Sequence, residues 1–223
     1  MIGFVCGTGY EDIFPYDRTF HTPYGKVVYS QVEGIVAVNR HMRDIPPHRI
    51  PYKAIVYFFK KKGIRFVIGA SAVGSLRKEI PPGSLVIPSQ LVDFCGVYTF
   101  HDNARIHAPM REPFSPTLRK IIENCLRNIG ENFVRNTTYI CNPGPQFETL
   151  AEVKFFSQIG DIIGMTVGPE AKLFREMNIE YQPICVVTNF AGEDEDHERN
   201  VALASQKSEI IKKILFCAKS QNL

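Results

Sequence analysis

The sequence predicts an α/β fold, with a single domain over residues 1–223 and a central mixed β-sheet flanked by helices. Three observations lead to this prediction. Short apolar runs rich in β-branched residues alternate with segments of helical periodicity. The composition is that of an ordinary globular chain, with 44% hydrophobic and 22% charged residues. No linker, repeat or low-complexity segment divides the sequence.

Length and charge limit the classes of function. A chain of 223 residues buries about 70% of its unfolded surface, so it needs no disulfide or metal in order to fold. The formal charge of +3 is too small to favour nucleic acid as a partner. The sequence contains no run of about 18 apolar residues, so it predicts no membrane-spanning helix. Residues 1–7 lack the basic region of a signal peptide, which favours the cytoplasm.

The six cysteines predict neither a metal site nor a disulfide framework. They form no CxxC pair and no Cys/His cluster at zinc-finger spacing. Most lie inside apolar runs, so we expect free, reduced and buried thiols. The cysteines are Cys6, Cys95, Cys125, Cys141, Cys185 and Cys217.

The first sixty residues predict a strand, a hairpin and a helix. The apolar run 1–6 reads as a strand that ends at Gly7-Thr8-Gly9. Segments 26–31 and 35–39 are joined by the short Gly-containing turn 32–34, which is typical of a β-hairpin. Pro51 suits the first turn of a helix, and Gly63 after three lysines suits its end.

The middle of the chain predicts two strands and a long connection. Segments 65–69 and 84–88 are apolar and rich in β-branched residues. Residues 93–113 show no clear period and contain His101 and His107. Long connections in compact domains are often functional, so we expect this segment to contribute to a site or an interface.

The last hundred residues predict alternating helices and strands. Ser115-Pro116 opens a helix that Gly130 ends, and residues 134–141 form a strand. Thr149 caps the next helix, with Glu152 at the capping-box position. The remaining expected elements are a strand at 161–165, a helix at about 169–177, a strand at 182–188 and a helix at about 198–218.

Small and polar residues follow directly after five apolar runs. Ligands in such sheets bind beyond the carboxyl ends of strands. Taken singly, each segment is better explained as a tight turn, a helix cap or a solvated strand exit. Together they supply the hydroxyls, glycine amides and guanidinium that a phosphate dianion needs. The segments are Gly7-Thr8-Gly9, Arg40-His41, Ser71-Ala72, Met165-Thr166 and Asn189-Phe190-Ala191.

Seven sequence blocks, in order, resemble the trimeric purine nucleoside phosphorylases and methylthioadenosine phosphorylases. The resemblance spans about residues 3–205, and its most specific blocks are residues 144–149 and 164–170. The blocks are Gly7-Thr8-Gly9, Asn39-Arg40-His41, Ala70-Ser71-Ala72-Val73-Gly74-Ser75-Leu76, Pro82-Gly83-Ser84-Leu85-Val86-Ile87-Pro88, Gly144-Pro145-Gln146-Phe147-Glu148-Thr149, Gly164-Met165-Thr166-Val167-Gly168-Pro169-Glu170 and Val187-Thr188-Asn189-Phe190.

The resemblance implies phosphorolysis of a purine nucleoside, which yields free base and ribose 1-phosphate. Inorganic phosphate is then a co-substrate, and no cofactor or metal is implied. Cleavage builds positive charge on the ribose and negative charge on the purine, so an anion is needed beside the sugar and donors at the base. By resemblance, the residues that hold phosphate are Thr8, Arg40, His41, Ser71, Ala72 through its amide, and Thr166.

The resemblance also implies a purine subsite. Met165 would pack on the ribose and Phe147 on the purine, with Phe190 and Ala191 nearby. The expected catalytic residues are Glu148, Asn189 and His41. An ionised Glu148 accepts a hydrogen bond from N1–H of a 6-oxopurine but faces a lone pair on adenine, whereas the Asn189 amide donates to O6 or N7. Ordinary structure offers alternatives, because Glu148 also suits a helix start and Phe147 also suits a core.

The segment near the C-terminus leaves the 5′ substituent open. Val201 corresponds to an apolar residue of methylthio-specific members, and His197, one turn earlier, could bond a 5′-hydroxyl. His107 resembles a residue that reaches into a neighbouring subunit, which implies a homotrimer or a dimer of trimers. Asp93-Phe94-Cys95 departs from the usual Asp-Arg-Thr.

The sequence therefore predicts a 6-oxopurine nucleoside phosphorylase acting on inosine, guanosine or 5′-methylthioinosine. Two alternatives remain open. One is an S-methyl-5′-thioadenosine phosphorylase. The other is a non-catalytic nucleoside-binding protein of the same fold.

Overall fold

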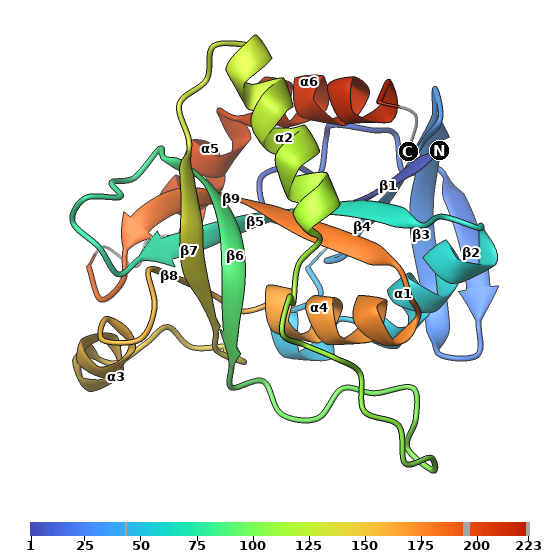
Figure 1. Cartoon of the computed structure of the whole chain (residues 1–223), viewed down its shortest axis with the longest axis horizontal. Coiled ribbons are helices and arrows are strands. Elements are labelled where there is room, and N and C mark those ends of the chain that lie inside the picture. Colours follow the sequence, from blue (N-terminus) through green and yellow to red (C-terminus); the bar gives the residue numbers. More distant parts are fainter. Residues whose placement is uncertain (43, 194–196, 222–223) are drawn as a thin grey trace.

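A computed structural model of the chain confirms the α/β fold class, with a mixed sheet of nine strands and helices on both of its sides (Figure 1). The structure describes residues 1–42, 44–193 and 197–221. Within these ranges, no helix is both long enough and apolar enough to cross a membrane.

Four parallel strands form the centre of the sheet. They are β1 (Ile2–Cys6), β4 (Ile35–Asn39), β5 (Phe66–Ser75) and β9 (Glu180–Phe190). β1 pairs with β4 on one side and β5 on the other, and β5 pairs along its whole length with β9. Because parallel strands share a direction, the carboxyl ends of all four lie at one edge of the sheet.

The other strands extend the sheet at one end and close it at the other. β2 (Arg18–Thr22) and β3 (Gly25–Val32) add antiparallel strands beside β4. β6 (Leu85–Asp93), β7 (Val134–Cys141) and β8 (Ile162–Gly164) connect β9 back to β5. The pairings β5–β8–β7–β6–β9–β5 therefore form a closed ring.

The helices cover two faces of the sheet. α1 (Tyr52–Lys61) and α4 (Val167–Glu176) pack together on one face, and α2 (Pro116–Asn128) and α6 (Ser208–Lys219) on the other (Figure 1). α3 (Leu150–Phe156), α5 (His197–Ser205) and the 3-10 turn η1 (Pro47–Arg49) lie outside these two pairs. The two buried clusters on either side of the sheet hold the fold together through the hydrophobic effect.

Local signals in the sequence correctly placed several element boundaries. The Ser115 side chain accepts a hydrogen bond from the Leu118 amide at 3.1 Å, which begins α2. Thr149 and Glu152 form the predicted capping box of α3. The strand at 134–141 has the predicted bounds, as has the hairpin strand at 35–39. These features depend on neighbours within a few residues, so the sequence is enough to find them.

Two central strands are longer than predicted, and one strand was missed. β5 continues through Ser75 and β9 through Phe190, so the small residues after position 69 are strand rather than loop. β5 and β9 pair along the full length of β5, and this pairing makes strand of residues that have little strand preference of their own, such as Gly, Ala and Ser. β2, at the sheet edge, has an irregular pattern of exposure that carries little periodicity.

The single final helix predicted over residues 198–218 is wrong, because the structure has two helices there. α5 ends at Ser205 and α6 begins at Ser208. α5 packs against β9 and the turn at Gly9, whereas α6 packs against β1 and α2. The change of direction follows from these different partners, and a run of helical periodicity does not reveal it.

The expectation that all cysteines are free is also wrong for one pair. Cys125 of α2 and Cys217 of α6 form a disulfide across 92 positions of sequence. Cys6, Cys95, Cys141 and Cys185 are free. The helical stripes that contain Cys125 and Cys217 meet only when the two helices pack side by side, so their spacing in the sequence gave no sign of the pairing.

Candidate active site

A cavity of about 340 Å³ opens at the edge where the carboxyl ends of the parallel strands meet. That volume lies within the range of small-molecule sites. The cavity is lined by residues that follow β1, β4 and β8, by the second half of β5 and by the end of β9. The loop before α3 and Asn200 of α5 complete it.

Most residues that the sequence singled out line this one cavity. They are Thr8, Arg40, His41, Ser71, Ala72, Phe147, Glu148, Met165, Thr166, Asn189 and Ala191. Phe190 and Val201 are half-buried and do not line it. His107 is exposed on the long connection, away from the cavity lining. The side chain of His197 lies outside the described residues.

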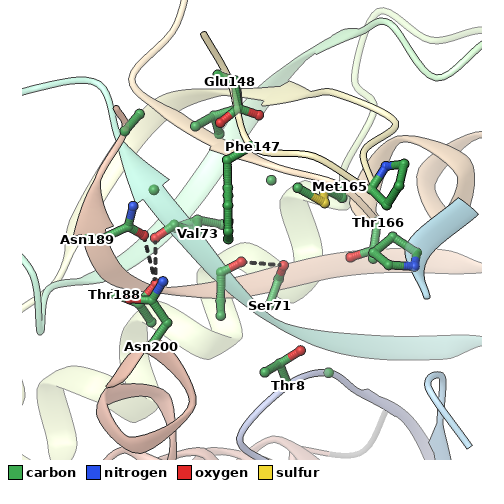
Figure 2. Close-up of a pocket in the computed structure, with 18 of the residues that line it drawn as sticks. Thr8, Ser71, Val73, Phe147, Glu148, Met165, Thr166, Thr188, Asn189 and Asn200 are labelled. Carbon is green, nitrogen blue, oxygen red and sulfur yellow. Dashed lines mark hydrogen bonds between the residues drawn. The ribbon is translucent and has the colours of Figure 1, made fainter. Parts of the chain in front are cut away.

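Hydroxyl groups gather in one half of the cavity. Figure 2 shows Thr8 at the bottom of the view, Glu148 at the top, and Ser71 and Thr166 between them. Gly7 allows the loop after β1 to lie close to β5, because a Cβ at that position would lie 2.6 Å from the Ala70 carbonyl oxygen. The hydroxyls of three distant segments therefore face a common space, which suits an anion with several acceptor oxygens.

Arg40 supplies the positive charge of this half, and all three of its guanidinium nitrogens have partners. Nε and Nη2 donate to the carbonyl oxygens of Cys6, Val5 and Ala70 at 3.3, 3.3 and 2.5 Å. Nη1 donates to the Thr166 hydroxyl oxygen and contacts a Glu170 carboxylate oxygen at 3.2 Å. Because Thr166 Oγ1 accepts from Arg40, its own O–H is left to donate into the cavity.

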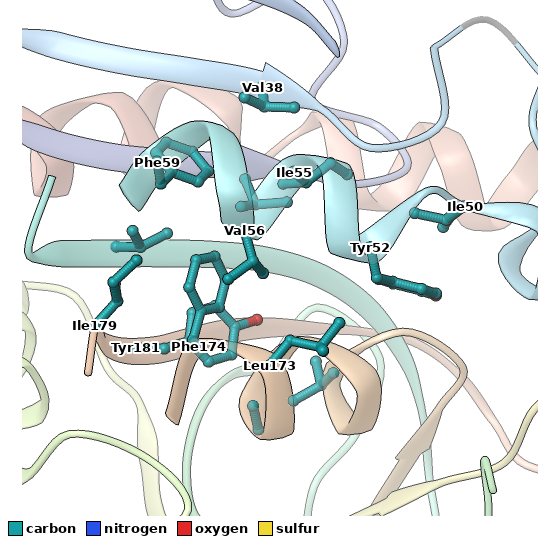
Figure 3. Packing of buried hydrophobic residues seen from close by; sticks show 14 of the residues in the cluster. Val38, Ile50, Tyr52, Ile55, Val56, Phe59, Leu173, Phe174, Ile179 and Tyr181 are labelled. Atoms are coloured by element: carbon teal, nitrogen blue, oxygen red, sulfur yellow. The ribbon is translucent and has the colours of Figure 1, made fainter. Parts of the chain in front are cut away.

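Glu170 and Tyr181 hold Arg40 in place from the core. Both are buried, and the Tyr181 hydroxyl donates to Glu170. Burial lowers the pKa of the Arg40 guanidinium, but the Glu170 carboxylate together with Tyr181, Tyr52 and Cys6 outweighs that effect and leaves this pKa raised. Burial raises the pKa of the Glu170 carboxyl, while Arg40 and Tyr181 oppose the rise. Figure 3 shows Tyr181 beside Phe174, with which it stacks, among residues of α1 and α4.

A short turn after β4 fixes His41. The Asn39 side-chain oxygen accepts hydrogen bonds from the His41 and Met42 amides at 3.0 and 3.2 Å. The ring nitrogen Nδ1 of His41 lies 2.8 Å from the Ile45 carbonyl oxygen. Since a carbonyl only accepts, Nδ1 is the donor in this contact and carries a proton.

Polar groups of a different kind stand in the other half of the cavity. Glu148 is 8% exposed, and Asn142 Nδ2 donates to its carboxylate at 3.2 Å. Phe147, at 36% exposed, presents an aromatic ring beside it. A buried carboxylate next to a ring is suited to a flat heterocycle that offers an N–H at its edge.

The Asn189 amide is oriented by its neighbours. Its oxygen accepts from the Thr188 hydroxyl at 3.1 Å, and its nitrogen donates to the Phe190 carbonyl at 3.0 Å. These bonds fix the orientation of the amide group, and the second N–H of its nitrogen can donate to a ligand. Thr188 also bonds to the Val73 carbonyl, which ties β9 to β5 at this point (Figure 2).

Sequence reasoning missed four lining residues. Pro47, Ile163, Gly192 and Asn200 lie outside the blocks that carry the family resemblance. Asn200 is buried in α5, between the two positions that the sequence analysis considered there. An Asn inside a helix competes with the backbone for hydrogen bonds, and that low propensity was the available signal.

Comparison with known proteins identifies the family. Residues 2–216 match the model of the family described as the phosphorylase superfamily. The chain belongs to this superfamily. One family match therefore covers nearly the whole chain, and it confirms the resemblance seen in the sequence blocks.

Curated relatives of this superfamily member carry three different activities in their names. A probable S-methyl-5′-thioinosine phosphorylase of Thermodesulfovibrio yellowstonii is 40% identical, over 86% of this chain and 78% of the relative. An S-methyl-5′-thioadenosine phosphorylase of Thermococcus kodakarensis is 39% identical, over 85% and 79%. A 6-oxopurine nucleoside phosphorylase of Pyrococcus furiosus is 36% identical, over 97% and 91%.

Solved structures of superfamily members agree with the fold. Methylthioadenosine phosphorylase of Schistosoma mansoni in complex with adenine has a TM-score of 0.88 at 25% identity, covering 98% of this chain and 90% of that one. A methylthioadenosine phosphorylase from an Antarctic soil metagenomic library has a TM-score of 0.84 at 32% identity, covering 100% and 87%. The superfamily fold thus extends over essentially the whole of this chain.

Proposed function

We propose that this protein cleaves 6-oxopurine nucleosides with inorganic phosphate, releasing the free base and a ribose 1-phosphate. The three curated relatives are named as phosphorylases of purine nucleosides. Such an activity makes the protein a pentosyltransferase. The observation that carries the finer proposal is the division of one cavity into a hydroxyl-lined half beside Arg40 and a half with a buried Glu148.

The hydroxyl-lined half suits the phosphate. Thr8 and Thr166 offer O–H donors, the Ser71 hydroxyl donates to the Ala72 carbonyl at 3.3 Å and would turn toward phosphate, and Arg40 supplies charge next to Thr166. As the glycosidic bond breaks, positive charge develops on the ribose, so an oriented dianion beside C1′ both stabilises that charge and attacks it. His41 Nε2 is the further group proposed to contact the phosphate or the sugar. The electron pair of the broken bond leaves with the purine, and a phosphate oxygen forms the new bond to C1′.

The other half suits the leaving base. Glu148 accepts from N1–H of a 6-oxopurine, and the second N–H of Asn189 donates to O6 or N7 as negative charge builds there. Phe147 stacks on the ring and Met165 packs against the ribose. Adenine would place its N1 lone pair toward the Glu148 carboxylate, so that two acceptors would face each other in a buried site.

Product analysis tests the proposal. We expect inosine with phosphate to give hypoxanthine and ribose 1-phosphate, and we expect no base release when phosphate is omitted. Chromatography of the products measures both. A protein that binds hypoxanthine but releases no base from any nucleoside is instead a non-catalytic binder, and the proposal is then wrong.

S-Methyl-5′-thioadenosine phosphorolysis is the second candidate. It is favoured by the structural likeness to methylthioadenosine phosphorylases and by the name of the Thermococcus relative. The same assay with inosine, methylthioinosine and methylthioadenosine distinguishes the two. Preference for methylthioadenosine over methylthioinosine would overturn the role given to Glu148, whereas a methylthio preference within the 6-oxopurines would only fix the 5′ substituent.

We also propose a cytoplasmic homotrimer or dimer of trimers that uses phosphate as co-substrate and no cofactor or metal. Support comes from large apolar side chains exposed on and after α3, next to the cavity, namely Leu150, Phe155 and Ile159. Several large apolar side chains exposed within one short segment are typical of an interface. We expect light scattering after size exclusion to give three or six times the 25.3 kDa chain mass; a monomer at assay concentration contradicts the proposal.

A further inference from the structure

Two free cysteines from distant parts of the chain have their sulfur atoms in contact. Cys95 Sγ lies 3.2 Å from Cys141 Sγ. Among the free cysteines of the described part of the chain, Cys6, Cys141 and Cys185 are buried and Cys95 is half-buried. The pair therefore has one member that a small reagent can reach and one member protected behind it.

A turn at the end of β6 brings the two sulfurs together. Asp93 is the register partner of Cys141 in the parallel pair β6–β7, and the Phe94 amide donates to the Cys141 carbonyl at 2.8 Å. The Cys95 amide then donates to Asp93 Oδ1 at 2.8 Å, which bends the chain back toward β7. The backbone itself therefore holds Cys95 over Cys141.

The surroundings favour thiol chemistry over metal binding. Asp93, Cys95 and Cys141 offer ligand atoms within 4.8 Å of one another. However, Lys172 forms an ion pair with Asp93 Oδ2, and Asp93 Oδ1 accepts the Cys95 amide. The Gly168 amide donates to Cys141 Sγ at 3.2 Å. An ammonium beside the carboxylate repels a cation, which leaves two thiols and no third free ligand.

We propose that Cys95 and Cys141 form a reversible disulfide when the protein meets a low-molecular-weight disulfide. The Cys95 thiolate attacks one sulfur of the small disulfide and expels the other as a thiolate. Cys141 then attacks Cys95 Sγ, the second small thiolate leaves, and it takes up the Cys141 proton. The two protein thiols lose two electrons, and the small disulfide is reduced to two thiols.

Protonation state sets the order of these steps. Burial and the adjacent Cys95 thiol raise the pKa of Cys141 well above its usual value. Cys141 is therefore a poor first nucleophile toward a reagent in solution. Once Cys95 carries the mixed disulfide, the contact between the two sulfurs makes the second step intramolecular, and proximity compensates for weak ionisation.

The new bond would alter the nucleoside pocket, and this part of the proposal rests on the function proposed above. A disulfide needs the sulfurs at about 2.05 Å, so they must approach by about 1 Å. Cys141 cannot move alone, because the next residue, Asn142, donates to Glu148. Its sulfur also accepts from Gly168, two residues after Thr166. A shift of this size in a positioned site lowers rate, and we expect about a tenfold fall in kcat/KM for inosine.

Treatment of the full chain with oxidised glutathione tests the proposal. Peptide mapping by mass spectrometry is expected to find a Cys95–Cys141 link that dithiothreitol removes, separate from the Cys125–Cys217 link. Cys95→Ser should form no new link and should keep its activity during the treatment. Cys185→Ala, which removes a free cysteine outside the pair, should still form the link.

Each of the other outcomes contradicts a specific part of the proposal. A stable glutathione adduct on Cys95 without the internal link rejects the disulfide. Uptake of one Zn²⁺ by the reduced protein, lost in Cys95→Ser, makes the cluster a metal site and also rejects it. The link with unchanged kinetics, in a protein that does phosphorolyse inosine, rejects only the effect on the pocket. Absence of activity before treatment rejects the proposed function and leaves the mapping result valid.

Discussion

The double variant Glu148→Ser, Asn189→Asp is expected to reverse much of the base preference of this protein. Under the proposed function, the buried Glu148 carboxylate, held by Asn142, requires a donor at purine N1, and the Asn189 amide requires an acceptor. A rigid polar mismatch of this kind discriminates by about 10⁴–10⁵ in kcat/KM. In the variant, Ser donates to the N1 lone pair of adenine and Asp accepts from its amino group, so the adenosine-to-inosine ratio should rise by several orders of magnitude.

The ratio of kcat/KM values for inosine and adenosine measures this effect. Glu209→Ser is a matched control, since Glu209 is exposed on α6 and is absent from the cavity lining. It should leave the ratio unchanged. An unchanged ratio in the double variant, with phosphate kinetics intact, would contradict the assignment of Glu148 to the purine N1 position.

Arg40→Met is expected to harm both folding and phosphate use. Arg40 donates hydrogen bonds from all three of its guanidinium nitrogens, and its removal leaves the Glu170 carboxylate buried without its cation. Removing one partner of a buried ion pair lowers the free energy of unfolding by about 3–5 kcal/mol. Loss of the charge beside Thr166 should also raise the phosphate KM strongly, because nothing else replaces it at that hydroxyl.

A second variant separates the two effects. Arg40→Met combined with Glu170→Gln removes the unpaired charge and keeps an acceptor for the Tyr181 hydroxyl. Urea denaturation should show that much of the lost stability returns, whereas the phosphate KM should remain high. If the phosphate KM of the stable double variant equals that of the native protein, Arg40 has a structural role only.

The sequence alone determined the fold class, the family and most of the candidate site. Caps and turns such as Ser115 and the Thr149–Glu152 box depend on residues a few positions apart, so they are readable from the chain. The apolar runs fixed which segments become the central strands. The polar segments after those runs supplied nine of the predicted site residues that line one cavity, and the family resemblance supplied Phe147 and Glu148.

Only the tertiary structure decided where long-range partners meet. The full length of β5 depends on β9, and the break between α5 and α6 depends on the surfaces that each helix covers. The Cys125–Cys217 disulfide, the buried Glu170 behind Arg40, and the contact between Cys95 and Cys141 join residues far apart in sequence. Periodicity and spacing report on neighbours along the chain, whereas these contacts exist only after separate elements have packed against one another.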